Sequence, residues 1–108
     1  MANYTARSRH HVYTHGHAAN SIPQPGKSRF FPREGGQKFT NEVIAATGPP
    51  IIQHDGRLRY EVLNLGRVVG YDRHGNSTAR GGVVIVEGLH PPHYSIFTHD
   101  EVVTQYPR

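Results

Sequence analysis

The sequence contains no cysteine among its 108 residues. A chain without thiols can form neither a disulfide nor a thiolate metal site, so both are excluded. No apolar run approaches the ~18 residues that a membrane-spanning helix needs. The first residues, MANYTARSRHH, also lack the apolar segment of a signal peptide. We therefore expect a domain without a membrane anchor.

Apolar residues are scarce as well, at 35% of the chain, whereas glycine contributes 12 residues and proline 8. This composition predicts a loop-rich domain with a thin core rather than a disordered chain. A length of 108 residues suits a single domain, 1–108, with one modest hydrophobic core. We expect this domain to be part of a larger protein.

Negatively charged residues are also scarce: the chain has 8 Asp and Glu residues and 12 Lys and Arg residues, which gives a formal charge of +4. All the fixed cations except Lys27 and Lys38 are arginines, which favour bidentate contacts with phosphate. The 9 histidines add positive charge below pH ~6.5. This balance indicates a nucleic-acid partner or, alternatively, a mildly basic surface with no such role.

The first half of the chain predicts helices separated by loops. Residues 1–9 are polar and aperiodic, which indicates a loose lead-in. A short helix is expected over His10–Ala19, although Gly16 disfavours it by about 1 kcal/mol relative to alanine. The pattern predicts a helix over Gln37–Ala46, followed by the stop signal Gly48-Pro49-Pro50. Between them, Lys27–Pro32 fits a short strand or turn.

The second half is β in pattern, with apolar residues alternating or running continuously between turn signals. The run GVVIVE is apolar throughout and predicts a central strand, and DRHGNS predicts a connection built on Gly75-Asn76. Connections this short favour antiparallel pairing. We therefore predict an α+β domain with one or two N-terminal helices packed on a four- to five-stranded antiparallel sheet. The expected strands are Arg57–Leu63, Arg67–Tyr71, Gly82–Glu87, Tyr94–Phe97 and Val102–Tyr106.

The densest chemistry in the sequence is the cluster of His11, His15 and His17. Imidazoles titrate near neutral pH, so they can act as general base and general acid. The i, i+4 spacing of His11 and His15 and the His-Gly-His pattern also occur in zinc sites. No acidic residue lies within the cluster to complete such a site. The third interpretation is that these side chains are ordinary exposed or locally packed residues.

Two further groups could complete a site for a phosphate group. Lys27 and Ser28 offer an ammonium and a hydroxyl, although they also fit a polar turn before a buried phenylalanine. Thr104 and Tyr106 are two residues apart in the last predicted strand and therefore share a face. Arg57 and Arg59 share a face for the same reason, either as a solvated surface or as one that follows RNA. The remaining candidate contacts to substrate are Arg29, Arg67 and Arg80.

The order of these motifs resembles that of a known family. A histidine-rich start, GKSRFFP, a helix that ends near Gly48, GRVVGYDRHG, GVVIV and a terminal VVTQYP follow one another from about residue 10 to 107. This order is similar to that of the ribonuclease toxin domains of the barnase–EndoU–colicin–RelE-like superfamily. Those domains are C-terminal effectors of bacterial polymorphic and contact-dependent inhibition toxins. The related RNase A-like inhibition toxins also end with Thr and Tyr, so the subfamily stays open.

The resemblance implies an endoribonuclease that needs no metal or other cofactor. It implies that His15 or His17 is the catalytic histidine and that Lys27 and Ser28 bind phosphate. Thr104 and Tyr106 would complete the catalytic site from the last strand. The expected products are a 2′,3′-cyclic phosphate and a 5′-hydroxyl, with tRNA the expected substrate by analogy. It further implies secretion or delivery into the cytoplasm of a target bacterium, and a cognate immunity protein that is acidic.

Two other function classes remain open at this point. A non-catalytic RNA-binding or structural module of a larger secreted protein would account for the charge and the sheet. It would leave the clustering of His, Lys, Thr and Tyr unexplained. A histidine-ligated metalloenzyme is the third class, and its activity would be lost in EDTA.

Overall fold

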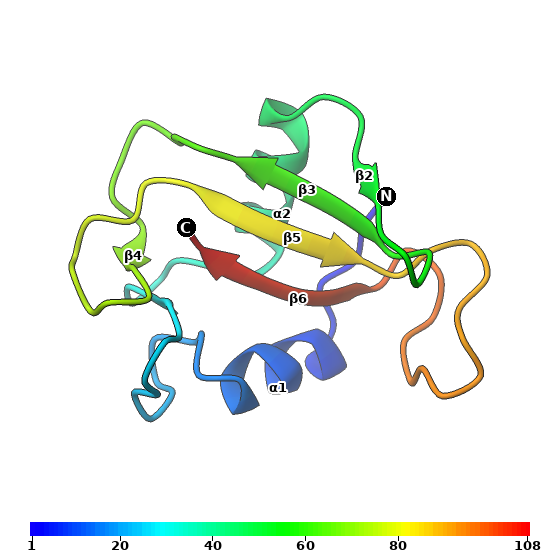
Figure 1. Ribbon diagram of the computed structural model, residues 1–108, viewed down its shortest axis with the longest axis horizontal. Helices are drawn as coiled ribbons and strands as arrows, with labels where there is room; N and C mark the ends of the chain where they lie inside the picture. The colour runs from blue at the N-terminus through cyan, green and yellow to red at the C-terminus, as the bar shows by residue number, and fades with distance from the viewer.

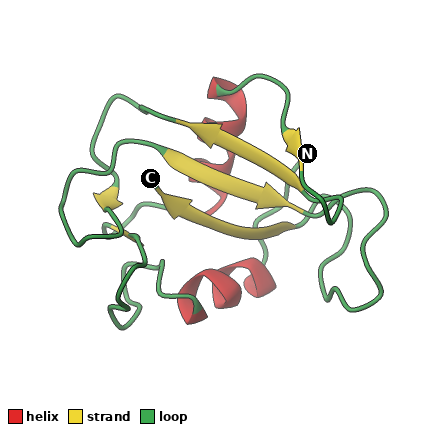
Figure 2. Ribbon diagram, viewed as in Figure 1, coloured by secondary structure: helices red, strands yellow, loops and turns green.

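The computed structural model describes residues 1–108 as two helices, a four-stranded sheet and a two-stranded sheet (Figures 1 and 2). All paired strands run antiparallel, and the larger sheet has the order β2-β3-β5-β6. The predicted α+β architecture is therefore confirmed. The helices are α1 (Ala6–Thr14) and α2 (Gly36–Ala46), and the strands are β1 (Arg29–Phe30), β2 (Ile51–Ile52), β3 (Leu58–Val62), β4 (Gly70–Tyr71), β5 (Gly82–Val86) and β6 (Val102–Pro107).

Helix α2 covers one face of the larger sheet, and α1 lies alongside β6 (Figure 1). Phe39 and Val43 of α2 are buried in the main hydrophobic cluster together with Val84 and Val86 of β5. Val83 and Ile85, which alternate with them along β5, belong to a second cluster on the opposite face. Strand β5 is buried along its whole length because apolar groups cover it on both faces, as its continuous apolar sequence predicts.

Strand β6 is fixed against both helices by polar side chains that are themselves buried. The amide of Gln105 accepts a hydrogen bond from the Gly36 nitrogen and donates one of 2.9 Å to the hydroxyl of Thr40. On the α1 side, the buried hydroxyl of Ser8 donates to the carbonyl of Val102 at 2.5 Å. These contacts hold β6 in one register, which determines the side chains that it presents on its other face.

The start of the chain differs from the predicted loose lead-in at residues 1–9. Helix α1 begins at Ala6, capped by Thr5, whose hydroxyl accepts from the Ser8 nitrogen while the Ser8 hydroxyl accepts from the Thr5 nitrogen. Ala2 is buried, and Asn3 forms a bridge with Glu101. The capping box explains the earlier start, since it satisfies main-chain N–H groups that would otherwise lack partners.

The end of α1 also differs from the predicted helix over His10–Ala19. The helix stops at Thr14, and Gly16 adopts a left-handed conformation with φ of 86°. The Gly16 nitrogen then donates to the Tyr13 carbonyl and the His17 nitrogen to the Val12 carbonyl, at 3.1 and 3.0 Å. This is a Schellman motif, which ends helices at a glycine. His17 therefore lies outside the helix and points in its own direction.

Two of the predicted strands are wrong in extent or in kind. Residues 94–97 form no strand, because the Ser95 nitrogen bonds locally to Pro92 and the Phe97 nitrogen to the Ser95 hydroxyl. Of the expected strand over Arg67–Tyr71, only Gly70 and Tyr71 pair, and they pair with β1 rather than with the larger sheet.

Candidate active site

The face of the sheet opposite α2 carries polar side chains in register with each other. Ile85 of β5 pairs with Arg59 of β3 and with Thr104 of β6. Two residues along, Val83 pairs with Glu61 and with Tyr106. Residues directly opposite each other share a face, so Arg59, Glu61, Thr104 and Tyr106 project from the same side of the sheet.

His17 packs against this face of the sheet at Tyr106. Its ring stacks on that of Tyr106, with centroids 5.0 Å apart and planes at 25°. Its Nδ1 lies 2.6 Å from the carbonyl oxygen of Ser28. A carbonyl can only accept, so Nδ1 carries the proton and Nε2 of the neutral ring is a free acceptor. The turn at Gly16 and the Ser28 carbonyl thus fix both the orientation and the tautomer of this imidazole.

The surroundings of His17 favour its neutral form. Burial lowers the pKa of His17 below its ordinary value, the bond to the Ser28 carbonyl opposes this, and the charge of Lys27 adds to the lowering. The residue keeps 8% of its surface exposed. An imidazole that is neutral near pH 7 and has an open Nε2 is suited to accept a proton from a bound molecule.

An open groove of about 680 Å³ runs past His17 and Tyr106. Lys27 and Ser28 line it from the loop before β1, and Lys27 forms no ion pair. Its remaining polar lining comes from the loop after β4 and from the chain end, namely Asp72, Arg73, His74 and Arg108. The groove therefore brings together a candidate base, several cations and a phenol.

The phenol of Tyr106 is part of a chain of charged side chains. Arg59 donates a hydrogen bond of 3.3 Å from Nη1 to the Tyr106 oxygen. The carboxylate of Glu61 forms ion pairs with Arg59, at 3.2 Å, and with Arg108, at 2.7 Å, so it links the two guanidinium groups. Because the phenol oxygen accepts from Arg59, its own O–H can donate to a group in the groove.

The other two histidines of the cluster lie apart from the groove lining. The rings of His11 and His15 stack with centroids 4.2 Å apart, and His11 meets Phe97 edge-on at 5.6 Å. Burial, with the charges of His15 and Arg57 next, lowers the pKa of His11 to about 4. Its Nδ1 has no hydrogen-bond partner. No three His, Asp or Glu side chains of the chain are grouped so that they could hold a metal ion.

The structure distributes the predicted site residues unevenly. His17, Lys27, Ser28 and Tyr106 meet in the groove. Thr104 shares the face with Tyr106 without lining the groove, and His15 is exposed beside His11. The structure therefore brings the histidine and lysine segment together with Tyr106 of the last strand, and it places His17 rather than His15 in the groove.

The predicted substrate-binding arginines divide in the same way. Arg29 lies beside the groove, in an adjoining hollow. Arg57 is engaged by Glu87 and Asp55, and Arg67 by Glu34 and Glu42, so their charges are already matched by protein carboxylates. Arg80 is exposed outside both hollows. Four polar residues of the groove were not among the predicted site residues: Asp72, Arg73, His74 and Arg108.

The chain matches no protein-family model, and no curated protein or solved structure matches it either. Neither helix is long and apolar enough to cross a membrane. The function of the groove is therefore inferred from the side chains that line it and from their contacts.

Proposed function

We propose that this protein is an endoribonuclease that cleaves RNA by attack of a 2′-hydroxyl, without a metal ion. One observation carries the proposal above all. The Nδ1 proton of His17 is committed to the Ser28 carbonyl, which leaves Nε2 as an acceptor in a groove shared with Lys27 and Tyr106. A base, a cation and a proton donor in one open groove are what phosphodiester transesterification requires.

In the proposed reaction, Nε2 of His17 takes the proton of the 2′-hydroxyl as the oxygen attacks the adjacent phosphorus. The bond from phosphorus to the 5′-oxygen breaks, which gives a 2′,3′-cyclic phosphate and a 5′-hydroxyl. Lys27 stabilises the negative charge on the phosphorane oxygens. General base and general acid each contribute ~10²–10⁴-fold in reactions of this type.

Tyr106 is the group we assign to protonation of the leaving 5′-oxygen. Its oxygen accepts from Arg59, so the guanidinium would stabilise the phenolate that forms when the proton leaves. His17, which then holds the proton from the 2′-hydroxyl, can return it through water to the phenolate. This assignment replaces a second histidine, because His15 lies in the stack with His11 rather than in the groove.

We further propose that the chain is a ribonuclease toxin domain of the barnase–EndoU–colicin–RelE-like kind. The motif order supports this assignment, as does a helix followed by a four-stranded sheet whose last strand contributes to the site. In that role it would be part of a secreted effector that acts inside a target bacterium, with tRNA as a candidate substrate. A cognate immunity protein would present acidic residues to the cationic groove.

The decisive experiment incubates the purified chain with total RNA in excess EDTA. Cleavage that yields 2′,3′-cyclic phosphate ends, and that disappears in His17→Ala and Lys27→Ala, supports the proposal. Lys38→Ala is the matched control, because Lys38 is the other lysine of the chain and is exposed on α2. Cleavage only without EDTA would indicate a histidine-ligated metalloenzyme, and binding without cleavage would indicate an RNA-binding module.

A further inference from the structure

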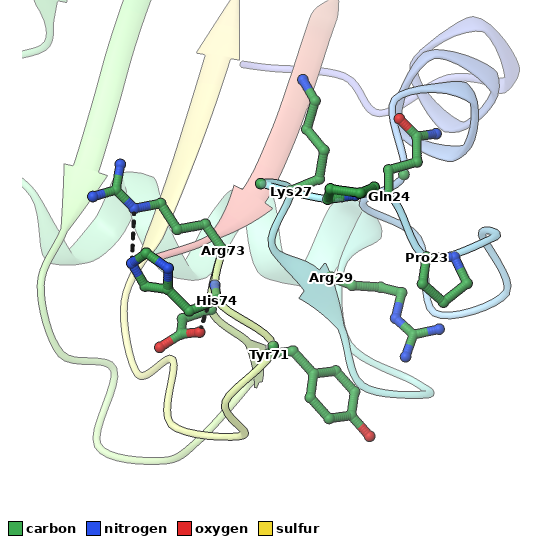
Figure 3. A pocket seen from close by; sticks show the side chains of 12 residues that line it. Pro23, Gln24, Lys27, Arg29, Tyr71, Arg73 and His74 are labelled. Atoms are coloured by element: carbon green, nitrogen blue, oxygen red, sulfur yellow. Dashed lines mark hydrogen bonds between the residues drawn. The ribbon is translucent and has the colours of Figure 1, made fainter.

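A second hollow adjoins the groove that contains His17. It has a volume of about 500 Å³ and shares Lys27, Arg73 and His74 with the groove, so the two form one continuous depression. Arg29 and Tyr71 line the second hollow but not the groove (Figure 3). The side chains labelled in Figure 3 come from two segments, the loop leading into β1 with the first residue of β1, and the end of β4 with the loop after it.

The pairing of β1 with β4 builds this hollow. Arg29 and Tyr71 are direct partners in that short ladder, and the guanidinium carbon of Arg29 lies 5.0 Å from the centroid of the Tyr71 ring. Phe31 holds the same ring from the side, at 5.1 Å and 90°. The strands approach this closely because residue 70 is a glycine, where a Cβ would lie 2.3 Å from the Arg29 oxygen. The planar cation is therefore held in a fixed position.

The hollow carries unbalanced positive charge. Lys27, Arg29 and Arg73 form no ion pair, whereas five other arginines of the chain do. Its only carboxylate, Asp72, accepts hydrogen bonds of 2.9 Å from the nitrogens of His74 and Asn76. That carboxylate is occupied in holding the turn, so the three cations are available to an anionic ligand.

We infer that the second hollow is a subsite for a nucleotide that flanks the cleaved linkage, which makes an extended RNA strand the substrate rather than a dinucleotide. This inference rests on the proposed function. Arg73 and Lys27 would bind a neighbouring phosphate, and the guanidinium plane of Arg29 would stack on a splayed-out base. Such contacts are typical of the recognition of single-stranded RNA.

The experiment compares a dinucleotide with a pentanucleotide that contains the same cleavable step. For the wild-type chain we expect kcat/KM to be about tenfold or more higher on the pentanucleotide, as a charge-assisted contact to phosphate would give. In Arg73→Ala and Arg29→Gln the ratio of the two values should fall toward one. Arg9→Ala, an exposed arginine of α1 that lines neither hollow, should keep the wild-type ratio.

Binding separates this inference from the proposed function. A 2′-O-methyl pentanucleotide cannot be cleaved by this chemistry, and its affinity is measured by fluorescence anisotropy. Weaker binding to Arg73→Ala and Arg29→Gln than to Arg9→Ala would support the subsite even if the chain cleaved no RNA. A wild-type ratio near one, or equal affinity in all three variants, would overturn it while leaving the cleavage proposal intact.

Discussion

The imidazole of His17 donates its Nδ1 proton to the main-chain carbonyl of Ser28 across 2.6 Å. Ser28 is next to Lys27, so one short segment both orients the base and supplies the cation that the proposed chemistry uses. A histidine held in this tautomer presents Nε2 to the groove without needing a carboxylate partner.

Replacement of His17 is expected to remove the proposed general base. His17→Ala should lower kcat/KM on RNA by at least ~10²-fold, the lower end of a general base contribution. The assay is the rate of appearance of 2′,3′-cyclic phosphate ends, with circular dichroism to verify folding. His54→Ala, an exposed histidine in the turn between β2 and β3, is the control and should keep the wild-type rate. Wild-type activity in His17→Ala would refute the assignment.

The rate should also fall as the solution becomes acidic. His17 must be neutral to act as base, and burial lowers the pKa of His17 below 6.5, so activity should persist to a lower pH than an ordinary histidine would allow. A profile of kcat/KM against pH measures the titration of the free enzyme. A fall that is complete well above pH 6.5 would point to a different base.

The hydroxyl of Tyr106 can be tested without removing its ring. Tyr106→Phe keeps the stacking on His17 and deletes the proton donor, so we expect a loss of about 10²-fold in kcat/KM. Substrates with a better leaving group than the 5′-oxygen should recover most of this loss, because they need less protonation. A loss that is the same for good and poor leaving groups would assign Tyr106 a positioning role instead.

Stability should depend on pH through His11. Burial lowers the pKa of His11 from 6.5 to about 4, so between these values the unfolded chain binds a proton that the folded chain does not. The folded state is therefore most favoured above pH 6.5 and loses stability as pH falls toward 4. Melting temperatures of wild type and His11→Phe over that range should show a flatter dependence in the variant. An unchanged slope would mean that other groups cause it.

Arg67 should contribute to stability rather than to RNA binding. It is held by Glu34 and Glu42, and half-exposed ion pairs of this kind stabilise a fold by up to about 1 kcal/mol. Arg67→Ala should lower the melting temperature by a few degrees and leave kcat/KM on RNA unchanged. If the variant were as stable as wild type but cleaved RNA more slowly, Arg67 would instead be a residue that contacts the substrate.

The parts of the fold with a strong periodic signal could be predicted from the sequence. Helix α2 follows from the spacing of Phe39 and Val43 and from the stop at Gly48, and β5 follows from its unbroken apolar run. The start of α1 was missed because its capping box uses Ser8 where a glutamate or glutamine is typical. Its end is not evident from the pattern, because a glycine can either weaken a helix or terminate it, and only the positive φ of Gly16 shows that it terminates α1.

The candidate site was predicted in part for similar reasons. Tyr106 and Lys27 were indicated by residue type and order. Arg73 and His74 were not, because the loop that carries them is brought to the groove by β1 and β4, whose two-residue strands are too short to show any alternation. Their position depends on contacts between segments that are far apart in the sequence, and a local sequence pattern cannot predict such contacts.

The left-handed turn at Gly16 has a genetic consequence. Any other residue there would strain the main chain, and its Cβ would lie 3.0 Å from the side chain of Gln24. The direction of His17 would change although no groove residue had been altered. If the chain is toxic to cells, as the proposed function implies, selection for survival of cells that express it should therefore yield inactivating alleles at codon 16 as well as at codon 17.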